Sequence, residues 1–308
     1  MQLNQTFWAS FVLVAKQSHC PLAVWEELVA SHVVSDRMTF FNVGANKGYA
    51  VHGFLSRYAS HWFDVTPREW HDALLATQPS LWRACGVCSA CKAAPPKAVF
   101  EVPDVRVHAF EFMSENVKIL RRMFEKFSVP GLVHHRVVSN TDGVTHNEPG
   151  IDVLAGDERW GLHMMEKTIV NRTVRTIRLD TFCAKRNIHR ITHLSIDAEG
   201  NDPLVVEGTS RMLKERRIDL LEFEYHGQGA WTERTLRDVL HDLYGWGYEC
   251  FWQGVYGRVA PASDVFWSDD FEFRRWSNLV CSHLSPVLVQ LYKLSIVGAD
   301  MERPQDRT

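Results

Sequence analysis

Short apolar runs alternate with helical patterns along most of this chain, and no other feature of the sequence constrains the fold as strongly. Buried strands are predicted at the apolar runs 38–43, 105–110, 132–138, 191–196 and 218–223. Strands that alternate with helices of ten or more residues are typical of a doubly wound α/β sheet. Two later runs, 247–253 and 263–268, predict a closing pair of strands that gives this mostly parallel sheet an antiparallel edge.

The alternating pattern also divides the chain. We expect the main domain at 38–268 and an N-terminal helical extension at 1–37. Residues 61–102 separate the first helix from the second strand and are interpreted as an insertion, and 269–308 are expected to form a C-terminal helix and tail.

Composition excludes several classes of protein. Of the 308 residues 45% are hydrophobic, and eleven tryptophans and seventeen phenylalanines are incompatible with a disordered chain. The formal net charge of −3 gives no sign of a nucleic-acid partner. No window approaches the ~20 apolar residues of a transmembrane segment. The apolar stretch from Phe7 to Ala15 lacks the basic residues that begin a secretory signal, so we expect a cytoplasmic protein.

Two helix starts can be assigned from capping residues. Thr66, Pro67 and Glu69 have the spacing of a capping box with proline at the first helical position. Asp202 followed by Pro203 predicts an N-cap and a first helical residue after the fourth strand.

Polar residues follow the predicted strands at the points where the strands end. In an open α/β sheet, ligands bind beyond the carboxyl ends of the strands, so these residues are expected to share one rim. They are Asn42 and Gly44, Glu111, Asp197 and Glu199, and Glu224 and His226.

The first strand ends in a loop bounded by Gly44 and Gly48. Glycine lets the backbone approach a ligand closely, and the start of the following helix offers free N–H groups to an anionic part of it. A Gly-x-x-x-Gly loop is a weak signal, because ordinary turn chemistry explains it about as often as ligand binding.

Glu111 at the end of the second strand could accept hydrogen bonds from ribose hydroxyls. In dinucleotide-binding proteins such an acid follows the glycine loop by about 20 residues, whereas here the separation from Gly48 is 63 (111 minus 48). The insertion at 61–102 accounts for the excess. The alternative is an ordinary solvated carboxylate.

Several short motifs occur together in a fixed order. They are Asn42-Val-Gly-Ala-Asn-Lys-Gly48, Phe110-Glu111, Leu179-Asp180, Ile196-Asp-Ala-Glu-Gly200, Val205-Val-Glu-Gly208 and Phe223-Glu-Tyr-His226. Each motif is unspecific, but the ordered set resembles the FkbM-type methyltransferase family over about residues 38 to 268. This resemblance implies a class I, Rossmann-type fold that binds S-adenosylmethionine and transfers a methyl group, commonly to a hydroxyl oxygen of a small molecule.

The resemblance also implies roles for single residues. Gly44, Ala45, Asn46 and Gly48 would line the amino-acid end of the cofactor, with Asn42 and Asp197 beside them. Glu111 would bind the ribose, and Ser139 and Asn140 would lie near the adenine. The sequence departs from the family at two positions, since Asn42 replaces the usual Asp and Phe112 replaces the usual Pro.

Transfer to a hydroxyl requires removal of its proton, and His226, Glu224 and Asp197 are the candidate catalytic residues. Alternate residues of an extended strand point the same way, so Glu224 could orient His226 as the base. In the competing interpretation Asp197 takes the proton and His226 binds the acceptor. Asp197 and Glu199 could also serve only to fix loop backbone, and His226 could be an ordinary loop histidine.

Cys85, Cys88 and Cys91 are closely spaced within the insertion. In an intracellular chain such spacing suggests a metal before a disulfide. Structural zinc requires four ligands, so a zinc site would need a distant fourth ligand such as His61 or His71. The alternative is free or redox-variable thiols without metal.

These observations favour an S-adenosylmethionine-dependent methyltransferase acting on a small molecule that carries a hydroxyl group. The alternative is a catalytically silent module that keeps the fold and uses the insertion for protein contacts. A nicotinamide oxidoreductase is disfavoured, because positions 44, 46 and 49 are Gly, Asn and Tyr and do not form the dinucleotide-binding motif.

Overall fold

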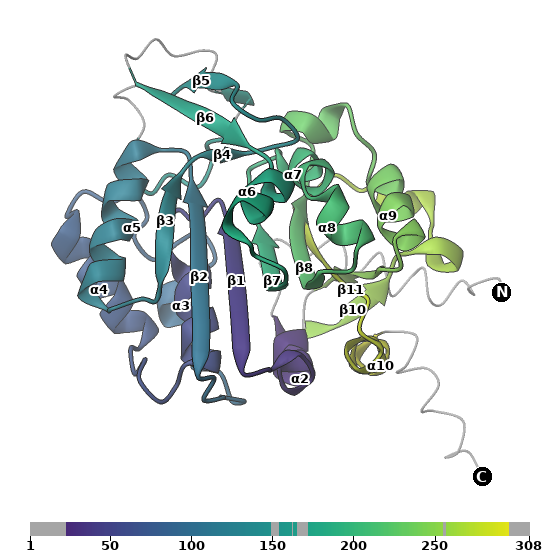
Figure 1. Ribbon diagram of the computed structural model, residues 1–308, viewed down its shortest axis with the longest axis horizontal. Coiled ribbons are helices and arrows are strands. Elements are labelled where there is room, and N and C mark those ends of the chain that lie inside the picture. The colour runs from purple at the N-terminus through teal and green to yellow at the C-terminus, as the bar shows by residue number, and fades with distance from the viewer. Residues whose placement is uncertain (1–22, 149–153, 162, 165–171, 255–256, 296–308) are drawn as a thin grey trace.

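The computed structural model describes residues 23–148, 154–161, 163–164, 172–254 and 257–295 (Figure 1). Residues 1–22, which hold most of the expected N-terminal extension, and the tail after 295 lie outside the described residues. The described part contains an eight-stranded sheet in the order β10-β9-β11-β8-β7-β1-β2-β3. The strands are β1 (Arg37–Val43), β2 (Asp104–Glu111), β3 (Gly131–His135), β7 (Ile191–Ile196), β8 (Ile218–Tyr225), β9 (Glu249–Gln253), β10 (Val259–Pro261) and β11 (Ser277–Ser282).

The sheet is mostly parallel with an antiparallel edge, as the sequence predicts. Neighbours from β3 to β8 pair in parallel, whereas β11 is antiparallel to both β8 and β9. The strand predicted at 263–268 is wrong. Asp264 has a left-handed φ of 49°, which interrupts an extended chain, and Asp264–Phe266 forms a 3-10 turn. The edge strand is β10, which pairs with β9, and β11, which lies beyond residue 268, joins β9 to β8.

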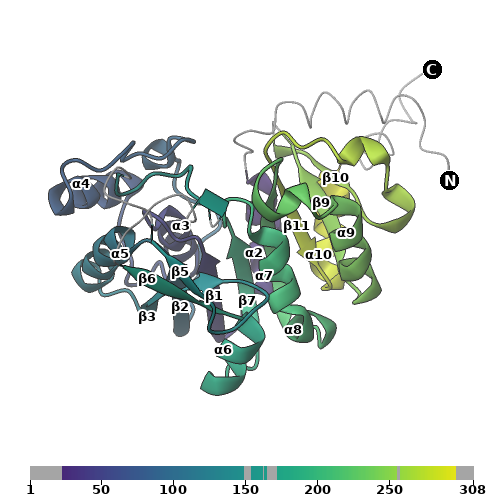
Figure 2. The same ribbon diagram turned by 90° about the horizontal axis from the view of Figure 1, so that it is seen from above.

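Helices cover both faces of the sheet because alternate residues of a buried strand point to opposite sides. In β1, Phe40 belongs to one apolar core and Phe41 to the other. The first core contains residues of α2 (Val24–Val33), α3 (Tyr49–Tyr58), α4 (Pro67–Thr77), α5 (Ser114–Lys126) and α10 (Ser285–Leu294). The second contains residues of α6 (Leu179–Arg186), α7 (Asp202–Gly208), α8 (Ser210–Lys214) and α9 (Leu236–Gly245), and Figure 2 shows the arrangement from above.

The predicted helix starts are partly confirmed. Thr66 and Glu69 form the complete capping box of α4. The N-cap of α7, however, is Asn201 rather than Asp202, which lies inside the helix. The Asp202 carboxylate is turned to other backbone groups, described below.

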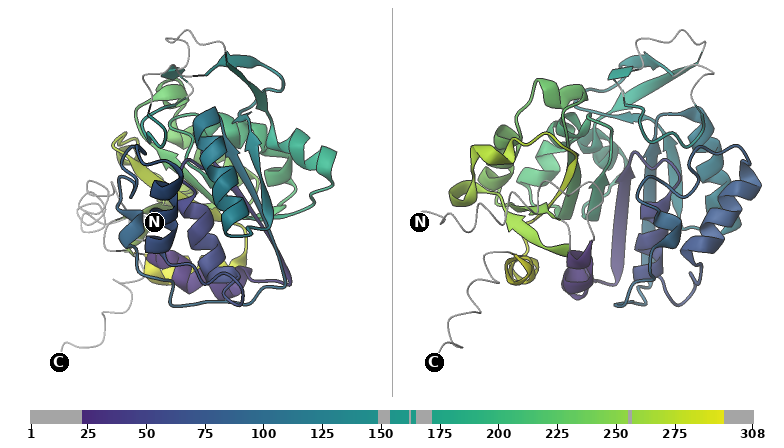
Figure 3. Two further views of the ribbon diagram at one scale, coloured as in Figure 1. Left: turned by 90° about the vertical axis from the view of Figure 1, so that its left-hand side faces the viewer. Right: turned by 180° about the vertical axis from the view of Figure 1, so that it is seen from behind.

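The predicted strand 132–138 divides into two. After β3 the chain runs past the end of β2, its neighbour in the main sheet. The last bond between the two is donated by Arg136 N–H to Glu111 O, at 3.1 Å. The next residues form β4 (Val137–Val138), which joins β6 (Thr173–Ile177) and β5 (Thr145–Asn147) in a small second sheet. This sheet lies at one end of the strands, and α2 and α10 pack together at the opposite end (Figures 1 and 3).

The chain reverses its direction of winding between β1 and β7, and Gly44 marks this switch point. Gly44 has φ +80°, and both Gly44 N–H and Ala45 N–H donate to Phe110 O at 3.0 Å. Asp197 N–H donates to Val43 O at 2.9 Å. A Cβ on Gly44 would lie 1.7 Å from the carbonyl oxygen of Asp197. Only glycine allows the ends of β1, β2 and β7 to approach this closely.

Substitution of Gly44 by alanine is therefore expected to destabilise the fold. The left-handed backbone and the overlap with Asp197 together predict a loss of roughly 2–5 kcal/mol in the free energy of unfolding. Gly53→Ala is the matched control, because a Cβ on Gly53 in α3 meets nothing within 4 Å, and it should stabilise by ~0.5–1 kcal/mol. Urea unfolding measures both changes, and equal stability of the two variants would contradict the close approach.

Candidate functional site

A cavity of about 300 Å³ opens at the carboxyl ends of β1, β2, β7 and β8, beside the switch point. The structure brings most of the sequence-predicted residues to its walls: Asn42, Gly44, Ala45, Asn46, Gly48, Glu111, Asp197, Glu199 and Glu224. Ser139, Asn140 and His226 do not belong to this lining.

The glycine loop is held against the second strand by Glu111. The carboxylate is 3% exposed, and it accepts Asn46 N–H at 2.9 Å and Met113 N–H at 2.8 Å. Burial raises the pKa of Glu111, and these hydrogen bonds oppose the rise. Glu111 is therefore not the solvated surface carboxylate of the alternative interpretation. The Asn116 side chain and the Phe112 backbone also bond this carboxylate, which lines the cavity.

Two amide side chains of the same region have oxygens without a hydrogen-bond partner among the described residues. They are Asn42 Oδ1 at the end of β1 and Asn46 Oδ1 in the glycine loop. Asn42 is only 2% exposed. Because buried polar atoms are nearly always paired, these oxygens are well placed to accept bonds from a ligand.

Ser139 and Asn140 contact α7 instead of the cavity. Asn140 Nδ2 donates to Glu207 Oε2 at 2.7 Å, and the Ser139 backbone lies against Gly208, whose Cβ would be 2.1 Å from Ser139 O. The preceding residues Val137 and Val138 do line the cavity.

Four carboxyl groups lie close together on the other side of the cavity: Asp197, Glu199, Asp202 and Glu224. Burial, followed by repulsion from neighbouring carboxylates, raises the pKa of each. The Asp197 side chain is open to the cavity, yet the protein around it, and then Glu158, raise its pKa to about 6. Trp276 Nε1 donates to Glu224 Oε1 at 3.1 Å.

Asp202 is completely buried and joins the loop after β7 to β8. Its carboxylate accepts Gly200 N–H at 3.1 Å and Glu224 N–H at 3.2 Å. The sequence predicted an N-cap here because Asp before Pro is a common helix start, but Asn201 holds that position and the Asp202 carboxylate bonds backbone groups of the loop and of β8. Asp202 thereby fixes the backbone next to Glu199 and at Glu224, which both line the cavity.

His226 follows β8 and is 1% exposed. Its ring stacks on Trp276 with centroids 4.4 Å apart, and Nδ1 accepts Gln228 N–H at 3.2 Å. An Nδ1 that accepts a hydrogen bond leaves the proton of neutral imidazole on Nε2. Burial lowers the pKa of His226 to about 4. The structure therefore stacks His226 on Trp276 and does not bring it to the lining of the cavity.

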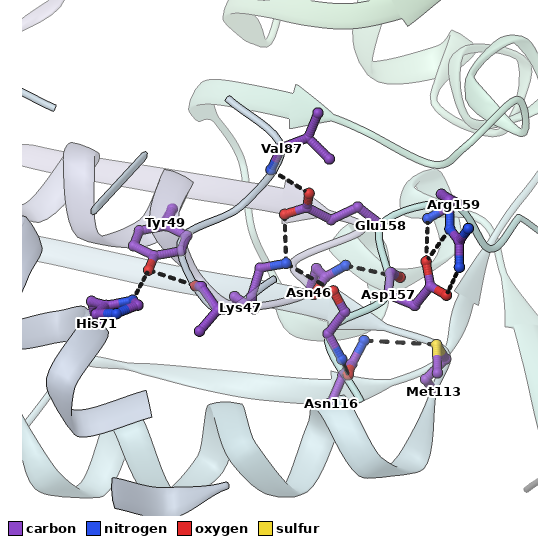
Figure 4. Close-up of polar contacts among 12 residues, drawn as sticks. Asn46, Lys47, Tyr49, His71, Val87, Met113, Asn116, Asp157, Glu158 and Arg159 are labelled. Carbon is purple, nitrogen blue, oxygen red and sulfur yellow. Dashed lines mark hydrogen bonds and ion pairs between the residues drawn. The ribbon is translucent and has the colours of Figure 1, made fainter. Parts of the chain in front are cut away.

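Residues 154–161 also reach the cavity, although the sequence analysis did not single them out. Lys47 is 2% exposed and lies between Gly156 O, at 2.8 Å, and Glu158 Oε1, at 2.6 Å (Figure 4). Glu158 Oε2 accepts Val87 N–H from the insertion at 2.7 Å. Asn46 Nδ2 donates to Asp157 O at 3.3 Å. The segment thus connects the glycine loop to the insertion. The residues that make this connection lie more than 70 positions apart in the sequence, so local sequence patterns do not indicate it.

The cysteines of the insertion form a disulfide where zinc ligands were expected. Cys85 pairs with Cys91, with Cα atoms 4.9 Å apart, and Cys88 is also disulfide-bonded. His71 Nδ1 lies 3.3 Å from the hydroxyl of Tyr49. In the part of the chain that the structure describes, no group of three or more His, Cys, Asp or Glu side chains is placed to hold a metal ion. The zinc prediction is therefore not supported, because oxidised sulfurs cannot serve as thiolate ligands.

Fold and cavity together define an α/β protein of the Rossmann type with a ligand cavity at its switch point. The model of the methyltransferase FkbM domain matches residues 42–250, and the chain belongs to this family. Among curated proteins, none matches the chain. None of the helices in the described ranges has the length and apolar character needed to span a membrane.

The disulfide can be tested by alkylation with iodoacetamide in denaturant without reductant. Cys183 is a free thiol and should be labelled, whereas Cys85 and Cys91 should be labelled only after dithiothreitol. Peptide mass spectrometry reads the result, and elemental analysis of the same sample measures zinc. Stoichiometric zinc together with labelling of Cys85 and Cys91 before reduction would restore the metal site predicted from the sequence.

Proposed function

We propose that this chain is an S-adenosylmethionine-dependent methyltransferase that methylates a hydroxyl group of a small molecule. The observation that carries the proposal is the position of Gly44, Glu111 and Asp197 around one cavity at the switch point. Membership of the FkbM methyltransferase family supports the same reaction class.

The residues present fit the cofactor. Its sulfonium and ammonium groups are cationic, and carboxyl groups outnumber basic groups on the cavity wall. The carboxyl groups are Glu111, Asp157, Glu158, Asp197, Glu199, Glu222 and Glu224, and the basic groups are Lys47 and Arg136. The unpaired oxygens of Asn42 and Asn46 add acceptors for its amino group, and Glu111 is placed for ribose hydroxyls. When bound, the cofactor supplies an electrophilic methyl group.

The chain's own contribution is to orient the acceptor and to receive its proton. Orientation in a fixed cavity can supply up to roughly 7–11 kcal/mol of the barrier. Asp197 suits the proton acceptor better than His226, because its carboxylate is open to the cavity and ionises near pH 6. His226 then acts through Trp276, which donates to Glu224.

A catalytically silent binding module is the second candidate, and the connection from the insertion through Glu158 to Lys47 is compatible with it. Transfer of a radiolabelled methyl group from S-adenosylmethionine to a metabolite extract separates the two functions. Binding of the cofactor without any transfer would favour the silent module.

The compartment proposed from the sequence needs revision in the light of the sulfur chemistry. Besides Cys85 and Cys91, Cys250 of β9 pairs with Cys281 directly opposite in β11. Disulfides persist in oxidising compartments and are rare in the cytosol. We therefore propose an oxidising compartment in place of the cytoplasmic location expected from the sequence.

Glu111→Gln should weaken S-adenosylmethionine binding by ~1.5–3 kcal/mol, the contribution of hydrogen bonds to a charged group. Glu115→Gln is the matched control, because it is the same substitution at an exposed position of α5, where the Glu115 side chain is 44% exposed. Calorimetry should show normal binding by the control. Equal affinities of the two variants for S-adenosylmethionine would show that Glu111 does not bind the cofactor.

Asp197→Asn should lower turnover by roughly 10²–10⁴ at saturating cofactor if Asp197 accepts the proton. The carboxylate must be ionised to act, so wild-type turnover should rise with pH through about 6 and then level. His226→Asn should cost less than about tenfold, since removal of the stacked ring only loosens Trp276. Measuring turnover against pH for the three proteins identifies the proton acceptor. A larger loss of turnover in His226→Asn than in Asp197→Asn would indicate that His226 is the base.

A further inference from the structure

A second cavity of about 200 Å³ adjoins the first. Both cavities are lined by Tyr49, Ala50, Ser195 and Glu222, so they share a wall. The second cavity lies on the sheet face that α2 and α3 cover. Residues 40 in β1, 193 in β7 and 220 in β8 form its floor.

The walls of this second cavity combine aromatic side chains with polar atoms that have no partner. Its aromatic residues are Trp25, Phe40, Phe54, Tyr49 and Tyr58. Trp25 Nε1 has no hydrogen-bond partner among the described residues, although Trp25 is 1% exposed. His193 is 9% exposed, and its Nε2 lies 3.8 Å from Glu222 Oε2, which is too long for a hydrogen bond. Leaving such a buried group unsatisfied is unfavourable, so a polar ligand is expected to supply the missing bond.

The charges around the second cavity disfavour an anion. Its single guanidinium, Arg57, is already engaged by Glu26 at 3.2 Å and Glu27 at 2.9 Å. Glu222 accepts Gln253 Nε2 at 2.7 Å and faces both cavities. A ligand carboxylate or phosphate would meet Glu26 and Glu222 without a free cation to pair with, and a buried unpaired charge is costly.

We propose that this second cavity binds the part of the methyl acceptor that lies away from the reacting hydroxyl, and that it selects an uncharged ring bearing hydroxyl groups. The inference rests on the proposed methyltransferase function. Aromatic walls supply contact area for a ring, while Trp25 Nε1 and His193 Nε2 supply two directed hydrogen bonds. The common wall lets one molecule occupy both cavities at once.

Resorcinol and 3-hydroxybenzoate are matched probes, since both are hydroxylated rings of similar size and only the second is anionic at pH 7.5. Saturation-transfer NMR titrations are expected to give saturable binding of resorcinol and at least about tenfold weaker binding of 3-hydroxybenzoate. Equal binding of the two probes, or no saturable binding of resorcinol, would overturn the proposal.

Two variants localise the probe. Gly53 lines the second cavity, and its Cβ would meet nothing within 4 Å, so Gly53→Leu fills that space and should abolish resorcinol binding, whereas Gly53→Ala should preserve it. Trp25→Phe keeps an aromatic ring but removes the N–H, and should weaken binding about tenfold. Unchanged binding in both Gly53→Leu and Trp25→Phe would place the probe elsewhere and overturn the proposal.

Calorimetry with S-adenosylmethionine on the same samples separates this inference from the proposed function. Normal cofactor binding with failure of the resorcinol experiment rejects only the second cavity as an acceptor site. Absence of cofactor binding rejects the methyltransferase proposal, while the selective binding of resorcinol is still measured directly. Gly53→Leu should keep cofactor affinity within about twofold, because Gly53 does not line the first cavity.

Discussion

The contact between Gly44 and the backbone of Asp197 is the constraint on which the site depends. A hydrogen in place of a side chain lets the loop after β1 pass over the end of β7, and the same loop is bonded to the last residues of β2. Three strand ends are thereby fixed relative to one another. Glu111 and Asp197 lie at the ends of different strands, and they face one cavity because the close contact at Gly44 fixes these strand ends.

The same crossing concentrates negative charge. Asp197, Glu199 and Glu224 end neighbouring strands or their loops, and after burial it is repulsion from Asp197 that raises the pKa of Glu199 and of Glu224. Burying unpaired carboxylates is unfavourable, and a fold built only for stability would replace them by apolar groups. The backbone bonds accepted by Asp202 hold the loop in place despite this repulsion. Such a wall is stabilised by protons or by a cationic ligand, which is the charge that a sulfonium cofactor brings.

Local sequence patterns predicted most of the sheet and the first-cavity residues, because the strand runs and their polar ends are properties of neighbouring residues. The errors share a different origin. The strand β11 depends on pairing with both β8 and β9. Asp202 accepts a bond from Glu224 N–H in β8, and Cys85 is paired with Cys91 through the path of the loop. Each of these features is decided by contacts between residues far apart in the sequence or by the path of a loop. The local sequence permits the predicted and the observed arrangement equally well, so periodicity and capping rules do not distinguish them.

Lys47 shows how the insertion becomes part of the site. A lysine that is 2% exposed requires a compensating charge, and Glu158 provides it from a segment 111 positions away (158 minus 47). Glu158 is itself oriented by Val87 N–H, within the loop that the Cys85–Cys91 disulfide closes. Loss of the Glu158 carboxylate would remove the ion pair of a buried ammonium and leave Gly156 O as its hydrogen-bond acceptor, a defect typically worth about 3–5 kcal/mol. The glycine loop that faces the cavity therefore depends on the insertion for its electrostatic balance, which couples a segment outside the sheet to the geometry at the switch point.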